Sequence, residues 1–174
     1  GICTLYPHAG FPSLPVGAVY GARARGDPHL WDYMPSGPYE TVSDVSSWLG
    51  KVAPSRDPLF YAVIDQASGQ AAGMVSYLSI VPEHGSSEIG HIWFGAGLQR
   101  SAGATEAVYL LARHAFEDLG NRRPEWKCDA QNARSRRAAE RFGLTFEGGF
   151  RHTRVVKGRH RGTAYGRNGC HRAS

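Results

Sequence analysis

The stretch Glu88–Leu111, EIGHIWFGAGLQRSAGATEAVYLL, passes from a strand-like run through a small-residue loop into a helical pattern. Its first part, Glu88–Phe94, mixes β-branched and aromatic residues as strands do, and Gly95 and Gly97 punctuate the loop after it. From Thr105 onward, apolar residues recur at three- and four-residue spacing, which indicates an amphipathic helix. The stretch therefore predicts a strand, a tight loop and a helix in that order.

The start of the predicted helix has the properties of an anion site. Its first N–H groups have no partner within the helix, and the helix dipole attracts negative charge. Ala102, Gly103 and Ala104 are small enough for a phosphate to approach the backbone closely. Small residues also serve tight packing between a strand and a helix, and a glycine-rich loop alone is a weak signal. Both interpretations stay open on this stretch alone.

Length and composition predict a single domain over residues 1–174, with 41% hydrophobic residues to build its core. No run approaches the roughly 20 apolar residues of a membrane span, and the first 20 residues do not resemble a signal peptide. Cys3, Cys128 and Cys170 are odd in number and widely spaced, which predicts a reducing, cytoplasmic location. None of the three cysteines has another metal-ligating residue at the short spacing typical of a metal site, so we expect no bound metal.

The net charge of +5 is unevenly distributed along the chain. Residues 151–174 contain seven Lys and Arg residues and no acid, so residues 1–150 carry −2. A basic tail can bind nucleic acid, but it is more commonly a solvated end. Tyr165 is its only aromatic residue close to the end apart from histidines, so we do not expect nucleic acid as a partner.

Hydrophobic patterns and turn residues place the remaining elements. We expect one helical turn ending at Met34 and a helix capped by Thr41 or Ser43 that runs to about Val52. The further expected helices are Thr105–Leu119 and Asn132–Arg141. The expected strands are Phe60–Asp65, Ala72–Ile80, Glu88–Phe94 and Trp126–Ala130. Leu144–Phe150 and Arg151–Val156 are expected as two halves of one long strand or as a bent strand. This order predicts an α/β or α+β domain with a mixed sheet.

Both ends of the chain lack a clear pattern. We assign no element to residues 1–25, whose prolines interrupt every candidate. Arg161–Tyr165 begins like a strand, but GRNGCHRAS after it shows no apolar alternation. We therefore expect the last strand to be missing or malformed, and residues 166–174 to form a disordered basic tail.

Two motifs give the chain a resemblance to a known family. The three-strand meander is followed by LQRSAGATEA opening a helix and then by EWKCDAQNARSRRAAERFGLTFEG. In this order and separation they resemble the GNAT acyltransferase superfamily, within it the branch of the ribosomal-protein N-terminal acetyltransferases. The resemblance covers Trp31 to about Tyr165 and implies a splayed sheet with acetyl-CoA, as co-substrate, between its fourth and fifth strands.

The resemblance also implies which residues bind acetyl-CoA. The pyrophosphate would lie on backbone amides at the start of the helix from Thr105, namely those of Gln99, Arg100, Ser101, Ala102, Gly103 and Ala104. The pantetheine arm would run beside Ile92, Trp93 and Phe94, and Asn132 would bond it from the other side. Arg100 and Arg136, with Arg141 as a further candidate, would pair with the nucleotide phosphates.

Catalysis would need a proton acceptor for the amine and a proton donor for the leaving thiolate. Ser135 matches the position at which the ribosomal-protein branch places the acid, and its alternative is an exposed hydroxyl in the first turn of a helix. Glu88 and His91 are the candidate bases, but strand alternation puts them on opposite faces unless a bulge intervenes. Arg154 stands where some relatives carry an acidic base.

The implied acceptor is a primary amine, either a protein N-terminus or a small molecule. Trp31, Tyr33 and Tyr39 would line its side of the site, although aromatic residues in such loops are also commonly lids over a core. Ala102 departs from the family's loop, which usually has glycine there. The alternative hypothesis is therefore a catalytically silent module that binds acyl-CoA or a partner; the oligomeric state is not predicted.

Overall fold

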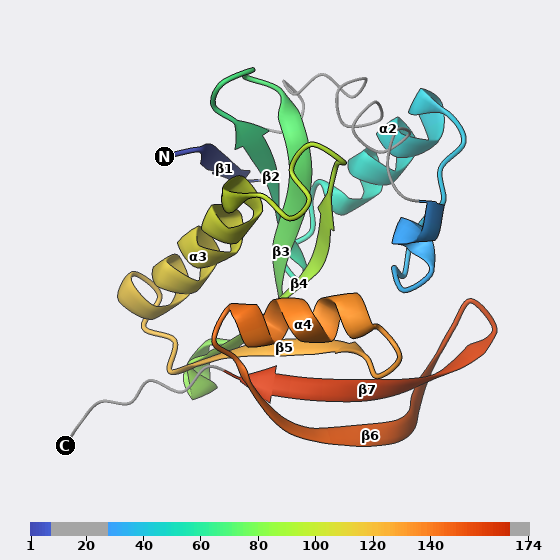
Figure 1. Ribbon diagram of the computed structural model, residues 1–174, viewed down its shortest axis with the longest axis vertical. Helices are drawn as coiled ribbons and strands as arrows, with labels where there is room; N and C mark the ends of the chain where they lie inside the picture. The colour runs from blue at the N-terminus through green and yellow to red at the C-terminus, as the bar shows by residue number, and fades with distance from the viewer. Residues whose placement is uncertain (8–27, 168–174) are drawn as a thin grey trace.

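The computed structural model describes residues 1–7 and 28–167, which form one mixed sheet with helices on both faces (Figure 1). The strands run in the order β1-β2-β3-β4-β5-β7-β6. Their bounds are β1 Cys3–Pro7, β2 Leu59–Asp65, β3 Ala71–Val81, β4 Ser86–Phe94, β5 Arg123–Asp129, β6 Thr145–Val156 and β7 Arg159–Arg167. The helices are α2 Val42–Val52, α3 Ala102–Glu117 and α4 Ala133–Arg141, with short 3-10 turns η2 Pro28–Trp31 and η3 Pro82–His84.

Two apolar clusters hold the helices to the sheet. Leu111 of α3 and Ala139 of α4 share one cluster with Ile89 and Cys128 of the strands, so these two helices cover the same face. Val45 and Leu49 of α2 belong to the second cluster, which includes Phe60, Met74 and Trp93 on the opposite face. A fully buried leucine such as Leu111, only 1% exposed, contributes about 1.5–3 kcal/mol to folding.

Each α-helix among the described residues begins at a side-chain cap. Thr41 and Asp44 form a reciprocal capping box before α2, which confirms the expected start. Asn132 caps α4 as expected. Ser101 caps α3, so this helix begins at Ala102, three residues earlier than its apolar periodicity indicates. Apolar periodicity misses such a first turn because its residues are too small to mark a hydrophobic face, although Gly103 and Ala104 are buried.

The sheet parts between β4 and β5. β2, β3 and β4 form the expected antiparallel meander, whereas β5 runs parallel to β4. Among the described residues, β4 and β5 pair only at Ser86–Arg123, Ser87–Pro124 and Glu88–Glu125. Beyond Glu88 the two strands diverge, and we call this opening the fork. The splayed sheet implied by the resemblance is confirmed.

The N-terminal end corrects the expectation that residues 1–25 hold no element. Cys3–Pro7 forms the edge strand β1, antiparallel to β2. Glu106 of α3 holds its start, because the Glu106 carboxylate accepts hydrogen bonds from the amides of Ile2 and Cys3. A five-residue edge strand held by distant partners leaves no periodic signal in its own sequence. Residues 8–25 lie outside the described residues.

The expectation of a missing or malformed last strand is wrong. β7 extends to Arg167 and pairs with β5 on one side and with β6 on the other. Its alternate residues are small because the space is tight: a Cβ on Gly162 would lie 3.3 Å from the Phe150 carbonyl oxygen, and one on Gly166 would lie 3.3 Å from that of Thr145. Residues 168–174 of the predicted tail lie outside the described residues.

Candidate active site

A bulge in β4 rearranges the strand at the fork. Ser76 of β3 pairs with Gly90, and Met74 pairs with Trp93, so two residues of β4 stand opposite one of β3. His91 has a φ of 47°, in the left-handed region, which is uncommon for a residue with a side chain. The bulge breaks the alternation of the strand and turns His91 to the face of Trp93 and α2.

Glu88 and His91 therefore share one face, which strict alternation excludes. Ile89 and Ile92 pack into the cluster under α3, whereas His91 stacks on Phe60 with ring centroids 5.5 Å apart. The Ser76 hydroxyl lies 3.4 Å from His91 Nδ1 and donates a hydrogen bond to the carbonyl of Gly90 at 3.0 Å. The backbone and the ring of His91 are thus both held in place at the fork.

The carboxylate of Glu88 is engaged across the fork. Its Oε2 lies 3.2 Å from Nζ of Lys127, and Lys127 also pairs with Glu125 at 2.8 Å. Burial alone would raise the pKa of Glu125, but Lys127 and Arg123 outweigh it and hold that pKa below 4.5. Burial would likewise lower the pKa of Lys127, but its two carboxylate partners raise it above 10.5. Glu125 and Lys127 are therefore both charged at neutral pH.

Part of the predicted phosphate loop is already hydrogen-bonded to itself. The Gln99 and Ser101 amides bond to the carbonyls of Gly95 and Leu98. The Ala104 amide bonds to the Ser101 hydroxyl, which in turn donates to the Leu98 carbonyl. The Thr105 amide bonds to the Ser101 carbonyl.

For the part of the chain that the structure describes, the loop amides without a protein acceptor are therefore those of Arg100, Ala102 and Gly103. Arg100 has a φ of 58°, in the left-handed region, and lies just before the cap of the helix. These three N–H groups at the start of α3 narrow the predicted anion site from six residues to three.

Gly103 is small because the core requires it. It is buried, and a Cβ on it would lie 2.8 Å from Cδ1 of Leu98 and 3.2 Å from Cγ2 of Ile2. Ala102 is exposed at the first position of the helix. Packing therefore accounts for the missing side chain of Gly103, whereas the anion interpretation concerns the backbone amides of Arg100, Ala102 and Gly103 and stays a prediction.

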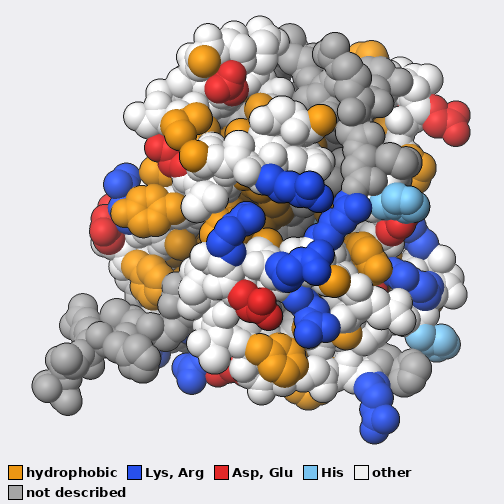
Figure 2. Space-filling view, in the orientation of Figure 1, with side chains coloured by type: hydrophobic (Ala, Val, Ile, Leu, Met, Phe, Trp, Pro, Cys, Tyr) orange, Lys and Arg blue, Asp and Glu red, His pale blue; other side chains and the backbone are white. Residues whose placement is uncertain are grey.

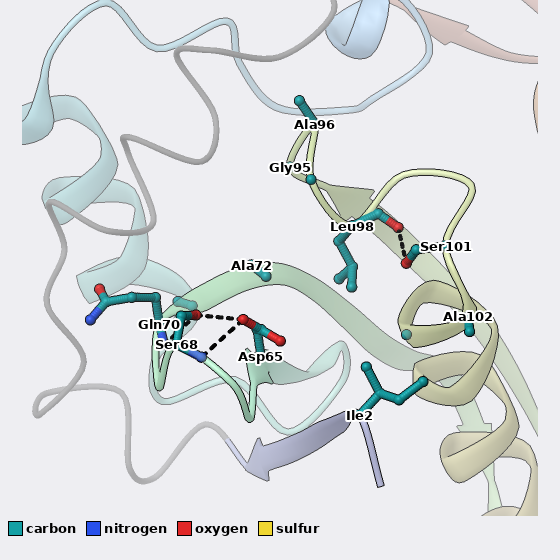
Figure 3. Close-up of a pocket in the computed structure, with 13 residues that line it drawn as sticks. Ile2, Asp65, Ser68, Gln70, Ala72, Gly95, Ala96, Leu98, Ser101 and Ala102 are labelled. Carbon is teal, nitrogen blue, oxygen red and sulfur yellow. Dashed lines mark hydrogen bonds between the residues drawn. The ribbon is translucent and has the colours of Figure 1, made fainter.

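A hollow of about 710 Å³ lies against the same loop from the β2–β3 side. Figure 3 shows Ala96, Leu98 and Ser101 on one side of it and Ile2 and Asp65 on another. Ala102 and Gly103 line it, whereas Asn132 and Ser135 do not.

The opposite wall of the fork comes from β5 and the first turn of α4. Asn132 Oδ1 accepts a hydrogen bond from the backbone amide of Ser135 at 3.0 Å. The side-chain amide nitrogen of Asn132 can therefore donate to another group. The Ser135 hydroxyl is partly buried and accepts a hydrogen bond from Trp126 Nε1 at 3.0 Å. Cys128 lies next to this hydroxyl, and burial raises the pKa of its thiol. A nucleophilic thiolate is therefore not favoured at Cys128.

Basic side chains surround the centre of the molecule. Figure 2 shows Lys and Arg gathered around a hollow at the middle of one face, with hydrophobic side chains inside it. Arg100 is exposed next to α3, and Arg136, also exposed, donates to the carbonyl of Ala130 at 3.3 Å. Arg141 lies at the other end of α4 over the Phe142 ring, away from the fork.

The three aromatic candidates divide into two groups. Tyr39 packs between Trp31 and Trp48, with ring centroids 5.4 and 5.7 Å away, as part of a lid over the α2 cluster. Tyr33 instead reaches the loop after β5, where its hydroxyl donates to the carbonyl of Gln131 at 3.4 Å. Of the three, Tyr33 is the one placed beside the fork.

The β6–β7 hairpin closes this side of the site, and Figure 1 shows its tip beside η2. Lys157 Nζ donates to the carbonyl of Trp31 at 2.8 Å. Arg159 pairs with Asp129 at 3.1 Å and lies over the Tyr33 ring, 5.0 Å from its centroid. We call these contacts of Lys157 and Arg159 the hairpin latch.

Sequence reasoning misses three residues that shape the site. It assigns Trp126 only to a strand, gives Lys127 none of the candidate roles and leaves Arg159 in the basic tail. The alternation of Trp126 and Lys127 along β5 is visible in the sequence. The partners of Arg159 lie 30 residues away at Asp129 and more than 120 away at Asp32, so no local signal could identify them.

Comparisons with known proteins agree with this geometry. A family model described as the GNAT acetyltransferase domain matches residues 16–145. A GCN5-related N-acetyltransferase from Brucella melitensis is 39% identical, with a TM-score of 0.90 over 97% of this chain and 76% of that one. A probable GNAT-family acetyltransferase from Chromobacterium violaceum is also 39% identical, with a TM-score of 0.86 over 97% and 83%.

A more distant structure is the spermidine N-acetyltransferase from Vibrio cholerae in complex with CoA and spermine. It is 18% identical, with a TM-score of 0.71 over 96% of this chain and 95% of that one, which shows the fold. A search of curated proteins found no match.

The splayed sheet and the open start of α3 at its fork define an acyl-CoA-dependent transferase. The chain belongs to the GNAT acetyltransferase family. It is an N-acetyltransferase, and enzymes of this family use acetyl-CoA as co-substrate. No helix among residues 1–7 and 28–167 is long and apolar enough to cross a membrane.

Proposed function

We propose that this enzyme acetylates a primary amine at the fork, with acetyl-CoA held between β4 and α4. The observation that carries the proposal is the fork itself, which has the open amides of α3 on one wall and the Ser135 hydroxyl on the other. The acceptor would be a protein N-terminus or a small molecule. A place in the ribosomal-protein branch is part of the proposal.

The residues around the fork fit acetyl-CoA. Its pyrophosphate would lie on the amides of Arg100, Ala102 and Gly103, which donate no hydrogen bond to any described residue. These amides lie at the positive end of the dipole of a 16-residue helix. The guanidinium groups of Arg100 and Arg136 would pair with phosphate oxygens. The exposed methyl of Ala102 fills the place of the usual glycine hydrogen and would weaken, rather than prevent, this contact.

The arm of the cofactor would lie along the wall of β4. Beyond Glu88, no described strand pairs with β4 on the β5 side. The backbone N–H and C=O groups of Ile92, Trp93 and Phe94 would therefore be available to hydrogen-bond the arm as they would a neighbouring strand. The amide nitrogen of Asn132 would bond from the other wall. Gln99 supports the same wall, because its Nε2 donates to the carbonyl of Phe94 at 2.9 Å.

Acetyl-CoA supplies the acetyl group as a thioester, and the net reaction exchanges one amine N–H for N–acetyl while the proton ends on sulfur. We favour His91 as the proton acceptor, because it lies on the acceptor face and imidazole titrates near neutral pH. Glu88 is the weaker candidate since Lys127 already holds its carboxylate. The Ser135 hydroxyl would donate to the leaving sulfur.

The acceptor would enter on the face shared by Glu88 and His91, beside Tyr33 and the hairpin latch. Trp31 and Tyr39 would line it less directly, since both pack into the lid over α2. A cytoplasmic location belongs to the proposal as well, and the free thiols of Cys3 and Cys128 support it.

Calorimetry with CoA, followed by thiol release from acetyl-CoA with a panel of amines, tests the proposal. We expect micromolar binding and saturable turnover with at least one primary amine. Binding without turnover across peptides, polyamines and other small amines would favour the silent module instead. No saturable binding of CoA at all would refute both.

A further inference from the structure

The candidate acid, Ser135, is held by a second residue that no sequence motif singles out. Trp126 Nε1 lies 3.0 Å from Ser135 Oγ, and the two residues belong to facing elements, β5 and α4. An indole N–H can only donate, so the Ser135 oxygen is the acceptor in this bond. The direction of the bond is therefore known without locating a hydrogen.

This direction limits what the Ser135 hydroxyl can do. A serine hydroxyl has one proton and two lone pairs. One lone pair faces the Trp126 N–H, so the hydroxyl proton has to point away from the indole. Asn132 fixes the other end of the residue, because its Oδ1 accepts the Ser135 amide at 3.0 Å. Few orientations remain for the O–H bond.

The indole is itself unable to move aside. Trp126 is only 6% exposed, and its ring packs against Phe142 at the end of α4, with centroids 5.8 Å apart. The ring also belongs to the core cluster that joins α3, α4 and the sheet. An orientation imposed by Trp126 is thus as rigid as the core.

We propose that Trp126 is a positioning residue, whose indole N–H turns the Ser135 O–H toward the sulfur of the bound cofactor. The inference rests on the proposed role of the fork and of Ser135. Cys128 already lies within reach of the same hydroxyl, and in the absence of the indole N–H the hydroxyl would be free to rotate further toward Cys128 or solvent. The Trp126 ring touches no reacting atom and acts only through Ser135.

A nuclear magnetic resonance experiment tests the inference without turnover. The ¹⁵N-labelled protein shows indole N–H signals, of which Trp126→Phe identifies the one from Trp126. We expect this signal to shift in Ser135→Ala, and to shift on adding CoA but not on adding desulfo-CoA, which lacks the sulfur. Equal shifts with both ligands, or none with either while other signals report binding, would overturn the inference but leave the function intact. If no signal of the protein changes on adding CoA, the protein does not bind CoA, and the proposed function itself is refuted.

Kinetics provide the second readout. Trp126→Phe keeps the ring and removes the N–H, and we expect kcat to fall about tenfold, the value of one hydrogen bond, with KM for acetyl-CoA unchanged. Because the effect passes through Ser135, the double variant with Ser135→Ala should be no slower than Ser135→Ala alone. Additive losses would assign Trp126 a merely structural role.

Tyr77→Phe is the matched control. It also removes one buried hydrogen bond from a ring, that of the Tyr77 hydroxyl to the carbonyl of Leu111, but at α3 and away from Ser135. We expect it to lower stability as Trp126→Phe does while leaving kcat within about twofold of the parent. An equal loss of kcat in both variants would contradict the positioning role.

Discussion

The ammonium of Lys127 lies 3.2 Å from the carboxylate of Glu88, directly beyond the last position at which β4 and β5 pair. The two strands carry no further backbone pairing there, so this ion pair is the first contact across the fork. Lys127 is 18% exposed and Glu88 9% exposed, so water screens their attraction only in part. The pair closes the base of the active site.

Replacing Lys127 with methionine should lower the free energy of unfolding by about 2 kcal/mol, because the half-buried carboxylates of Glu88 and Glu125 would lose the ammonium group that pairs with both. Chemical denaturation followed by circular dichroism measures this. Arg113→Met is the control, since Arg113 lies 3.8 Å from Glu117 on the exposed side of α3, and we expect a change below about 0.5 kcal/mol. Similar losses in both variants would show that the fork does not depend on Lys127.

Stability should fall in acid through the same group of charges. The pKa of Glu125 is lowered below 4.5 in the folded protein, so its contribution is present above pH 4.5 and is lost as the pH falls through the folded value. Lys127→Met removes a cause of that lowered pKa. Unfolding titrations between about pH 7 and pH 3 should therefore show a shallower acid dependence in Lys127→Met than in the parent. Parallel curves would contradict this assignment.

Gly103→Ala should weaken the binding of CoA several-fold. The new methyl would meet Leu98 at 2.8 Å and Ile2 at 3.2 Å, and relief of these contacts would move the first turn of α3 and its amides. Gly97→Ala is the control in the same loop, because a Cβ there has no described atom within 4 Å. Calorimetry should give an unchanged affinity for Gly97→Ala; a matching loss would mean that loop flexibility, and not amide placement, sets the affinity.

His91→Phe and Glu88→Gln separate the two candidate bases. Phenylalanine keeps the stacking on Phe60, whereas glutamine keeps the shape of Glu88 but removes its charge. We expect His91→Phe to lower kcat about a hundredfold, as loss of a general base does, and Glu88→Gln to lower it less. Steady-state assays at saturating acetyl-CoA decide the question. The reverse order of effects would move the base to Glu88.

Arg159→Met should raise KM for the amine and leave KM for acetyl-CoA unchanged. Arg159 holds Tyr33 and Asp129 together on the acceptor side, and the phosphate loop is on the other strand wall. Initial-rate measurements with each substrate varied in turn separate the two constants. If KM for acetyl-CoA rises instead, the hairpin latch serves the cofactor side.

Several features of this protein arise from local sequence alone. Thr41 and Asp44, three residues apart, form the capping box that starts α2, and Asn132 caps α4 at the expected position. The β2–β3–β4 meander results from alternating apolar runs separated by turns. Caps, turns and alternation act over about three to ten residues, so the sequence shows them directly.

Other features depend on partners far away in the chain. The strand β1 exists because β2 and Glu106 hold it, and β7 exists because β5 and β6 pair with it on both sides. Their own residues carry too little periodic signal to predict a strand. The motifs nevertheless predict an anion site at the start of α3, and the backbone contacts show which amides of that loop have no acceptor among the described residues.

The amino-acid sequence by itself determined the order of the main helices and strands from α2 to β6, the small-residue loop before α3 and the family to which the chain belongs. Only the tertiary structure decided that His91 shares the face of Glu88, that Lys127 engages Glu88, and that Trp126 orients Ser135. The physical reason is that a bulge is defined by mismatch with a neighbouring strand, and an ion pair or hydrogen bond between elements by their packing. Neither the bulge nor these contacts can be predicted from a single segment of the chain.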